Sequence, residues 1–292
     1  MRLTRPIAAA MLAYPAFVAA QTAPLTIRLT PTANQTLHMR MGQQTTFEIE
    51  PVDGAPAPIP LPAMTLGMTM TIVATLDVGA ADDQGRVEAR LTYDDIKADI
   101  TMNGVPSPMP ANPVAQMAGR VFTLVYDREG QIVDFKADVW DATYDAIKPM
   151  LSAMSNTLGA TGSVTLAVGE TVARPMTLAL PFPNAAAPGG LSAEMRFTLN
   201  SLTSEGSGRI AHLATAITGQ MKQPLPGSVA AAMVMQMTGS GTMDVNVDRG
   251  FVKSSEQRIT LNAAMDRPAD GAVPVPPLRM HGTITISQST EP

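Results

Sequence analysis

The sequence predicts a mainly β protein, in which an antiparallel sheet built from two similar halves is covered by one long helix. Three observations lead to this fold class. Apolar and polar residues alternate over long stretches, turns rich in Gly and Pro separate these stretches, and one segment alone shows a long run of helical spacing. Two arrangements stay open, namely one strongly curved sheet or half-barrel and two packed sheets.

The clearest alternation lies in Met64–Asp77, MTLGMTMTIVATLD. Apolar residues occupy its even positions, and threonine occupies most of the odd ones. Because successive side chains of a strand point to opposite faces, this stretch predicts a long strand with one apolar and one hydroxylated face. Threonine is β-branched and suits such a pleated surface.

The first half of the chain predicts a series of neighbouring strands. They are expected at Leu25–Thr30, Thr36–Glu50, Met64–Asp77, Arg86–Met102, Arg120–Tyr126 and Gln131–Ala137. Proline-rich Pro51–Pro62 must be a loop, because proline cannot donate to a sheet ladder. The apolar alternation of Arg86–Met102 changes phase at Asp94-Asp95, which predicts a β-bulge there. Asp127–Gly130 has the composition of a hairpin turn.

The segment Asp138–Leu158 predicts the long helix, with Asp138 as its cap, Pro149 dividing it and Gly159 after its end. Its apolar residues recur at three- and four-residue spacing. We expect this helix to lie over the concave side of the sheet, where the two elements would line a ligand cavity. The candidate lining residues are Met68, Met70, Trp140, Tyr144, Leu151 and Met154. Alternatively, Trp140 and Tyr144 only pack the helix onto the sheet.

After Gly159 a similar order of parts returns. Strands are expected in Ser163–Leu180, Leu191–Leu202, Arg209–Met221, Thr242–Val247, Phe251–Ala264 and Leu278–Gln288, and a short helix at Ser228–Met237. The matched segments are Met41-Gly42-Gln43 with Val168-Gly169-Glu170, Met64–Asp77 with Leu191–Leu202, and Asp127–Gly130 with Asp248–Gly250. This order predicts an internal duplication, with residues 21–158 and 159–292 as the two halves of one domain. The alternative is that any long antiparallel meander resembles itself.

Residues 1–20 have the pattern of an export signal. Arg2 and Arg5 precede the apolar stretch Ile7–Val18, and small residues precede an expected cleavage after Ala20. The apolar stretch is shorter than the roughly 20 residues of a membrane anchor. No later segment is long and apolar enough to span a bilayer, so we expect the mature chain to start at Gln21 and to be periplasmic or secreted.

The composition argues against several classes of function. A net charge of −5 is unsuited to binding nucleic acid. The chain has no cysteine, and its three histidines lie far apart in sequence, so we expect no metal, no cofactor and no catalytic residue. With 21 methionines and 4% aromatic residues, the core must be largely aliphatic and methionine-filled. Methionine adapts to varied apolar partners, although thioethers also bind copper(I).

Two stretches, Ala89–Gly104 (ARLTYDDIKADITMNG) and Gly119–Phe135 (GRVFTLVYDREGQIVDF), resemble a family of exported bacterial proteins of unknown function. Val168–Pro181 resembles a third segment of that family, with Val172 near a position where the family often has tryptophan. This family supplies no established activity. The expected architecture of long strands under a lid-like helix is similar to the half-barrels of LolA-like and LppX-like periplasmic lipoprotein carriers.

Together these features predict a non-enzymatic periplasmic protein that binds an apolar small molecule, a lipid or a lipidated partner. The alternative is a structural or interaction module of the cell envelope that holds no ligand. The sequence leaves the oligomeric state open.

Overall fold

The computed structural model describes residues 23–51, 62–107, 117–128, 130–139, 163–178, 191–206, 208–224, 232–266 and 278–292. These residues form strands and turns and contain no α-helix. The strands are β1 (Leu25–Arg28), β2 (Gln35–Pro51), β3 (Met64–Ala81), β4 (Val87–Met102), β5 (Val105–Pro106), β6 (Val121–Tyr126), β7 (Ile132–Ala137), β8 (Ser163–Leu166), β9 (Thr171–Leu178), β10 (Leu191–Glu205), β11 (Gly208–Pro224), β12 (Ala232–Asn246), β13 (Phe251–Asp266) and β14 (Leu278–Glu291).

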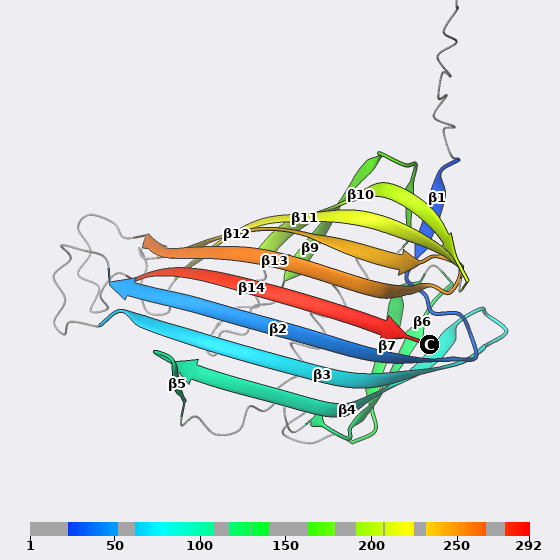
Figure 1. Ribbon diagram of the computed structural model, residues 1–292, viewed down its shortest axis with the longest axis horizontal. Coiled ribbons are helices and arrows are strands. Elements are labelled where there is room, and N and C mark those ends of the chain that lie inside the picture. Colours follow the sequence, from blue (N-terminus) through cyan, green and yellow to red (C-terminus); the bar gives the residue numbers. More distant parts are fainter. Residues whose placement is uncertain are drawn as a thin grey trace, which may run out of the picture.

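Twelve of the strands form one antiparallel sheet with the order β7-β6-β4-β3-β2-β14-β13-β12-β11-β10-β9, in which β5 pairs only with β4. The sheet curls so that its two ends lie behind its centre in Figure 1, where β14 and β2 face the viewer. Strands β7 and β9 are the edges, so the curled sheet is not closed. Strands β1 and β8 pair with each other in a separate two-stranded ribbon. One curved sheet is therefore present, rather than two packed sheets.

The two halves of the chain meet at the centre of the large sheet. Strand β2 pairs with β14 along almost its whole length, from Pro51 opposite Leu278 to His38 opposite Glu291. Within the large sheet, β3 to β7 lie on one side of this seam, and β9 to β13 lie on the other. The seam makes one continuous concave face from residues that are far apart in sequence.

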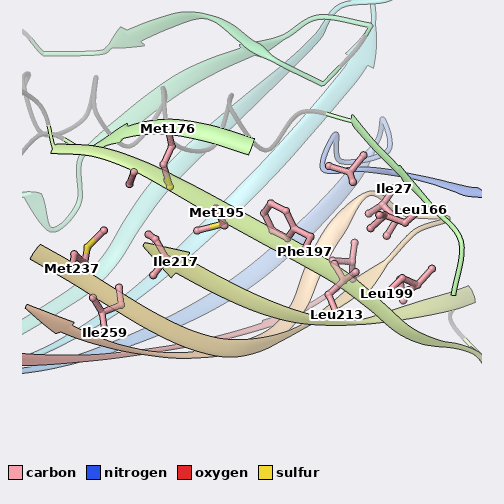
Figure 2. Close-up of a cluster of buried hydrophobic side chains, with 14 residues drawn as sticks. Ile27, Leu166, Met176, Met195, Phe197, Leu199, Leu213, Ile217, Met237 and Ile259 are labelled. Carbon is pink, nitrogen blue, oxygen red and sulfur yellow. The ribbon is translucent and has the colours of Figure 1, made fainter. Parts of the chain in front are cut away.

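The β1–β8 ribbon covers one end of the concave face. Ile27, Val164 and Leu166 from the ribbon pack against Phe197 of β10 and Leu213 of β11, and all five are buried. Figure 2 shows this cluster, in which side chains from β8 to β13 point toward one another. Leu166 is fully buried, which makes it one of the best-packed residues of the core.

The hairpin β6–β7 covers the same end on the other side of the seam. Phe122 of β6 is buried between two aromatic rings, edge-to-face with Tyr93 at 5.6 Å and stacked on Phe135 at 5.4 Å between ring centroids. Such pairs stabilise a core beyond the area that they bury. Burial raises the pKa of Tyr93 to about 12, so its hydroxyl stays protonated at physiological pH.

The prediction that a long helix covers the sheet is wrong. Asp138 and Val139 form a bend after β7, and the rest of Asp138–Leu158 lies outside the described residues. Among the described residues, the cover of the concave face consists of the β1–β8 ribbon and the β6–β7 hairpin. The apolar face of a sheet must pack against another element. Among the described residues, strands supply this partner in place of the expected helix.

The short helix predicted at Ser228–Met237 is also wrong over its described part, because β12 begins at Ala232. Met233, Met235 and Met237 alternate with Val234 and Gln236, which is strand periodicity. Met235 and Met237 are buried, and their partners on β13 hold them in the ladder. Tertiary pairing along β11 and β13 decides the structure of this stretch.

Two turns at the covered end depend on glycine. Gly130 and Gly250 have φ of 88° and 68°, and a Cβ on either one would collide with Thr30. Asp127–Gly130 and Asp248–Gly250 both connect adjacent strands, as their predicted correspondence requires. However, Met41-Gly42-Gln43 lies within β2, whereas Val168-Gly169-Glu170 is a turn between β8 and β9. The internal duplication stays a prediction.

The β-bulge predicted at Asp94-Asp95 is confirmed. Tyr93 pairs with Ala74 and Asp95 with Val73, so Asp94 is the extra residue of β4. Its carboxylate accepts a hydrogen bond of 2.7 Å from the Thr75 hydroxyl. The bulge keeps Tyr93 and the residues after it on the same concave face.

Deleting Asp94 should therefore remove only the extra residue, so that Tyr93, Ile96 and Ile100 all stay on the concave face. Chemical denaturation should show a loss of only about 1 kcal/mol, that of the hydrogen bond to Thr75. Deleting Lys97 is the matched control, because it lies in the regular part of β4 and its loss should turn Ala98 and Ile100 to the opposite face. That deletion should cost several of the roughly 5–15 kcal/mol that stabilise a domain. Equal losses for the two deletions would contradict the register.

Candidate functional site: the concave face of the sheet

The concave face is organised in rows of directly paired residues. In an antiparallel sheet, residues that pair across strands point to the same side. Five consecutive rows run across the sheet through Met64, Leu66, Met68, Met70 and Ile72 of β3. The row through Leu66, for example, continues through Phe47, Gly282, Leu261, Met237, Gly219 and Ala193 to Met176. These five rows are called the concave rows below.

The described methionines of the large sheet share one face, the concave one. Every methionine of the large sheet whose side chain the structure describes has the phase of that face. These residues are Met39, Met41, Met64, Met68, Met70, Met102, Met176, Met195, Met221, Met233, Met235, Met237, Met243 and Met280. Methionine has a flexible, polarisable side chain that fits partners of irregular shape.

Charge is nearly absent from the concave rows. Among their described residues, only Arg174 of the edge strand β9 is charged, and its guanidinium donates a hydrogen bond of 3.2 Å to the Ser163 carbonyl. The convex face of the same strands carries charges such as Arg40, Glu48 and Arg279. The two faces of the sheet therefore offer very different surfaces to a ligand.

Exposure varies along the strands of the first half. On β3, Ala74, Leu76 and Val78 are buried at the covered end, whereas Met64 to Ile72 are only half-buried. Strand β4 shows the same gradient, whereas on β2 Thr45, opposite Met68, is buried. The half-buried apolar residues here form the apolar patch, which consists of Met41, Phe47, Ile49, Met64, Leu66, Met68, Met70, Ile72, Ala98, Ile100, Ile284 and Ile286.

Three glutamines interrupt the concave rows beside this patch. Gln43 of β2 pairs with Met70 and Ile286, and Ile286 pairs with Gln257 of β13. Gln288 of β14 lies one row away, opposite Met41. All three side chains are half-buried. A few polar groups within an apolar surface are typical of a small-molecule site.

The structure places two of the six predicted lining residues in this site. Met68 and Met70 lie side by side in the apolar patch, on adjacent rows of β3. The other four, Trp140, Tyr144, Leu151 and Met154, lie outside the described residues. The glutamines were missed, although each has the apolar phase of its strand. Gln43 occupies an apolar position in the alternation from Leu37 to Ile49. A polar residue at such a position can be recognised from the sequence.

Three hollows in the described part of the chain lie away from the apolar patch. Two grooves of about 380 and 550 Å³ share Gln236 and lie among convex-face residues such as Glu48 and Glu194. A void of about 20 Å³ lies among Ile27, Leu166 and Phe197, within the closed core. Such a void has room for about one water molecule.

The three histidines lie on the convex face. His38 approaches Thr75 at 3.3 Å, and His281 approaches Asn262 at 2.7 Å between side-chain atoms. Within the described ranges, no group of three or more His, Asp or Glu side chains is arranged to hold a metal ion. Those ranges also contain no helix that is long and apolar enough to cross a membrane.

A hydrogen-bonded chain on the convex face crosses four strands. Thr203 Oγ1 lies 2.9 Å from His212 Nε2, and His212 Nδ1 lies 2.7 Å from Asp244 Oδ1. Ser254 donates a bond of 3.0 Å to the other Asp244 oxygen. The order hydroxyl–imidazole–carboxylate is that of a hydrolytic triad. However, the flanking strands pair in the sheet ladder, which occupies the backbone N–H groups that an oxyanion hole would need. These hydrogen bonds connect the side chains of β10, β11, β12 and β13.

Comparisons with known proteins identify no family. No family model matches, and no curated protein matches. A lipovitellin structure described by its lipid–protein interactions aligns with a TM-score of 0.47 and 8% identity over 88% of this chain, which spans only 25% of the lipovitellin chain. An outer membrane channel from Pseudomonas putida F1 aligns with a TM-score of 0.21 and 9% identity, over 90% of this chain and 98% of the channel chain. The InvG secretin domain from Salmonella aligns with a TM-score of 0.17 and 8% identity, over 89% of this chain and 63% of the InvG chain. The resemblance to an exported family stays an expectation, and the lid-like helix that suggested lipoprotein carriers is absent from the described residues.

Methionine oxidation can test whether the apolar patch is accessible. Met68 and Met70 are half-buried, whereas Met235 and Met117 are at most 1% exposed. Because oxidation to the sulfoxide follows exposure, dilute peroxide should modify Met68 and Met70 well before the buried pair. Peptide mapping by mass spectrometry gives the rates. Equal, slow oxidation of all four residues would show that the patch is closed.

Proposed function

We propose that this protein is a non-enzymatic binding protein that holds an apolar molecule against the apolar patch of its concave face. One observation carries the proposal: the concave rows are almost free of charge, yet twelve of their apolar residues, Met41 to Ile286, remain only half-buried. A contiguous apolar surface that is left partly open is typical of an interaction site.

The chemistry of the patch favours a small molecule or lipid of variable shape. Methionine and isoleucine supply most of the surface around Met68, and only Phe47 is aromatic. Flexible thioether side chains adjust to a chain-like partner, whereas rigid aromatic rings would select one shape. The bound molecule would gain roughly 25 cal/mol for each Å² of apolar surface that it removes from water.

We further propose that the protein acts after export, in the periplasm or outside the cell. Arg2, Arg5 and the apolar stretch Ile7–Val18 support this location. N-terminal sequencing of the exported protein should begin at Gln21. An intact Met1 in the exported fraction would contradict cleavage after Ala20.

A carboxylate introduced into the patch should abolish binding. In Met70→Glu the new charge would lie opposite Gln43 and Ala98. Among the described residues of the concave rows, Arg174 on the adjacent row is the one cation. Burying an unpaired charge is costly, so the Kd for the neutral dye Nile red should rise at least about tenfold. Fluorescence titration of the full chain measures the Kd.

Thr71→Glu is the matched control. Thr71 lies on the convex face opposite Lys97, so an added carboxylate there should leave dye binding unchanged. Melting temperatures of both variants separate lost binding from unfolding. If the wild type binds no dye, and organic extraction of protein from its own compartment releases no lipid, the ligand-free structural module is the better description.

A further inference from the structure

We propose that the ligand is a neutral amphiphile, whose uncharged hydrogen-bonding group, an ester, amide or hydroxyl, binds Gln43, Gln257 and Gln288. This inference rests on the proposed function and deepens it. It names the chemical class of the ligand and assigns the three glutamines as the residues that recognise its polar group. Together these side chains are called the glutamine patch.

The sheet register holds the glutamine patch on three adjacent strands. Gln43 and Gln257 flank Ile286 of β14 in one row, and Gln288 lies in the next row between Met41 and Ser255. Neighbouring strands are about 4.8 Å apart, so Gln43 and Gln257 are separated by about 10 Å. That separation suits a compact polar group, such as a glycerol ester, with an apolar chain extending over Met68 and Met70.

Each glutamine keeps hydrogen-bonding capacity for a ligand. Gln43 Nε2 donates to Thr45 Oγ1 at 3.0 Å, and Gln288 Nε2 donates to Thr290 Oγ1 at 3.3 Å. These bonds within each strand orient the amide and leave its carbonyl oxygen as an acceptor. In the described part of the chain, Gln257 has no side-chain hydrogen bond. A ligand that covers these amides must replace the water on them, so it needs donors and acceptors of its own.

The described residues around the glutamine patch offer no cation to a charged head group. Arg174 is the one cation among the described residues of the concave rows, and it lies on β9, four strands from Gln257. Four strand spacings correspond to about 19 Å. A carboxylate or phosphate at the patch would lose water without gaining an ionic partner, which is strongly unfavourable. A carboxamide can replace the hydrogen bonds to water that a neutral polar group loses on binding, because it offers both a donor and an acceptor.

Three pyrene-labelled probes with one alkyl chain can test this inference: an alkylpyrene, the free acid and its glycerol monoester. At pH 8 the monoester should bind the full-length protein at least about fivefold more tightly than the alkylpyrene, as one or more net hydrogen bonds imply. The ionised acid should bind most weakly. In the double variant Gln43→Met, Gln257→Met, the monoester should fall to the affinity of the alkylpyrene, while alkylpyrene binding stays unchanged.

Gln44→Met is the matched control, because Gln44 is the exposed neighbour of Gln43 on the convex face. It should keep the preference for the monoester. Equal binding of the monoester and the alkylpyrene would overturn the inference and leave the proposed function intact, as would tight binding of the free acid. If the alkylpyrene does not bind either, the proposed function itself fails.

Discussion

The pairing of β2 with β14 is the constraint on which the rest of the structure depends. These strands belong to opposite ends of the chain, and their ladder runs from Pro51 and Leu278 to His38 and Glu291. Without this seam, each half would present a sheet with one more unpaired edge, which is a liability in any β protein. With it, the concave rows through Leu66, Met68 and Met70 run unbroken from β4 to β9. The seam also places Gln43 beside the strands that carry Gln257 and Gln288.

The alternation of each strand then sorts the chemistry between the two faces. A pleated strand turns every second residue inward, so a single error in register would expose an entire apolar set. The Asp94 bulge shows how tightly this is controlled, because one extra residue keeps Tyr93 and Ile96 on the concave side together. Threonines and charges occupy the convex side, where hydrogen bonds between Thr203, His212, Asp244 and Ser254 connect neighbouring strands.

Local patterns predicted the strands, the Asp94 bulge and the orientation of Met68 and Met70, because these depend on periodicity within one strand. They failed where a distant partner decides the outcome. Met233 to Met237 fit a short helix as well as a strand until β11 and β13 are placed on either side. The glutamine patch needed the β2–β14 register, which no local pattern contains. The helical cover was inferred from an apolar stripe and a sheet that needed a partner, but the described cover is made of strands.

The covered and open ends of the concave face differ in what fills them. At the covered end, Phe122 is packed between two aromatic rings and Leu166 is fully buried, as a permanent core requires. At the open end, Met64, Met68 and Met70 are half-buried, although a compact fold would gain stability by burying them. A surface that stays apolar without being covered weakens the unliganded protein slightly. A ligand that binds only the folded chain recovers that stability by mass action. The gradient of burial along β3 thus divides a single sheet into a part that maintains the fold and a part where we propose that the ligand binds.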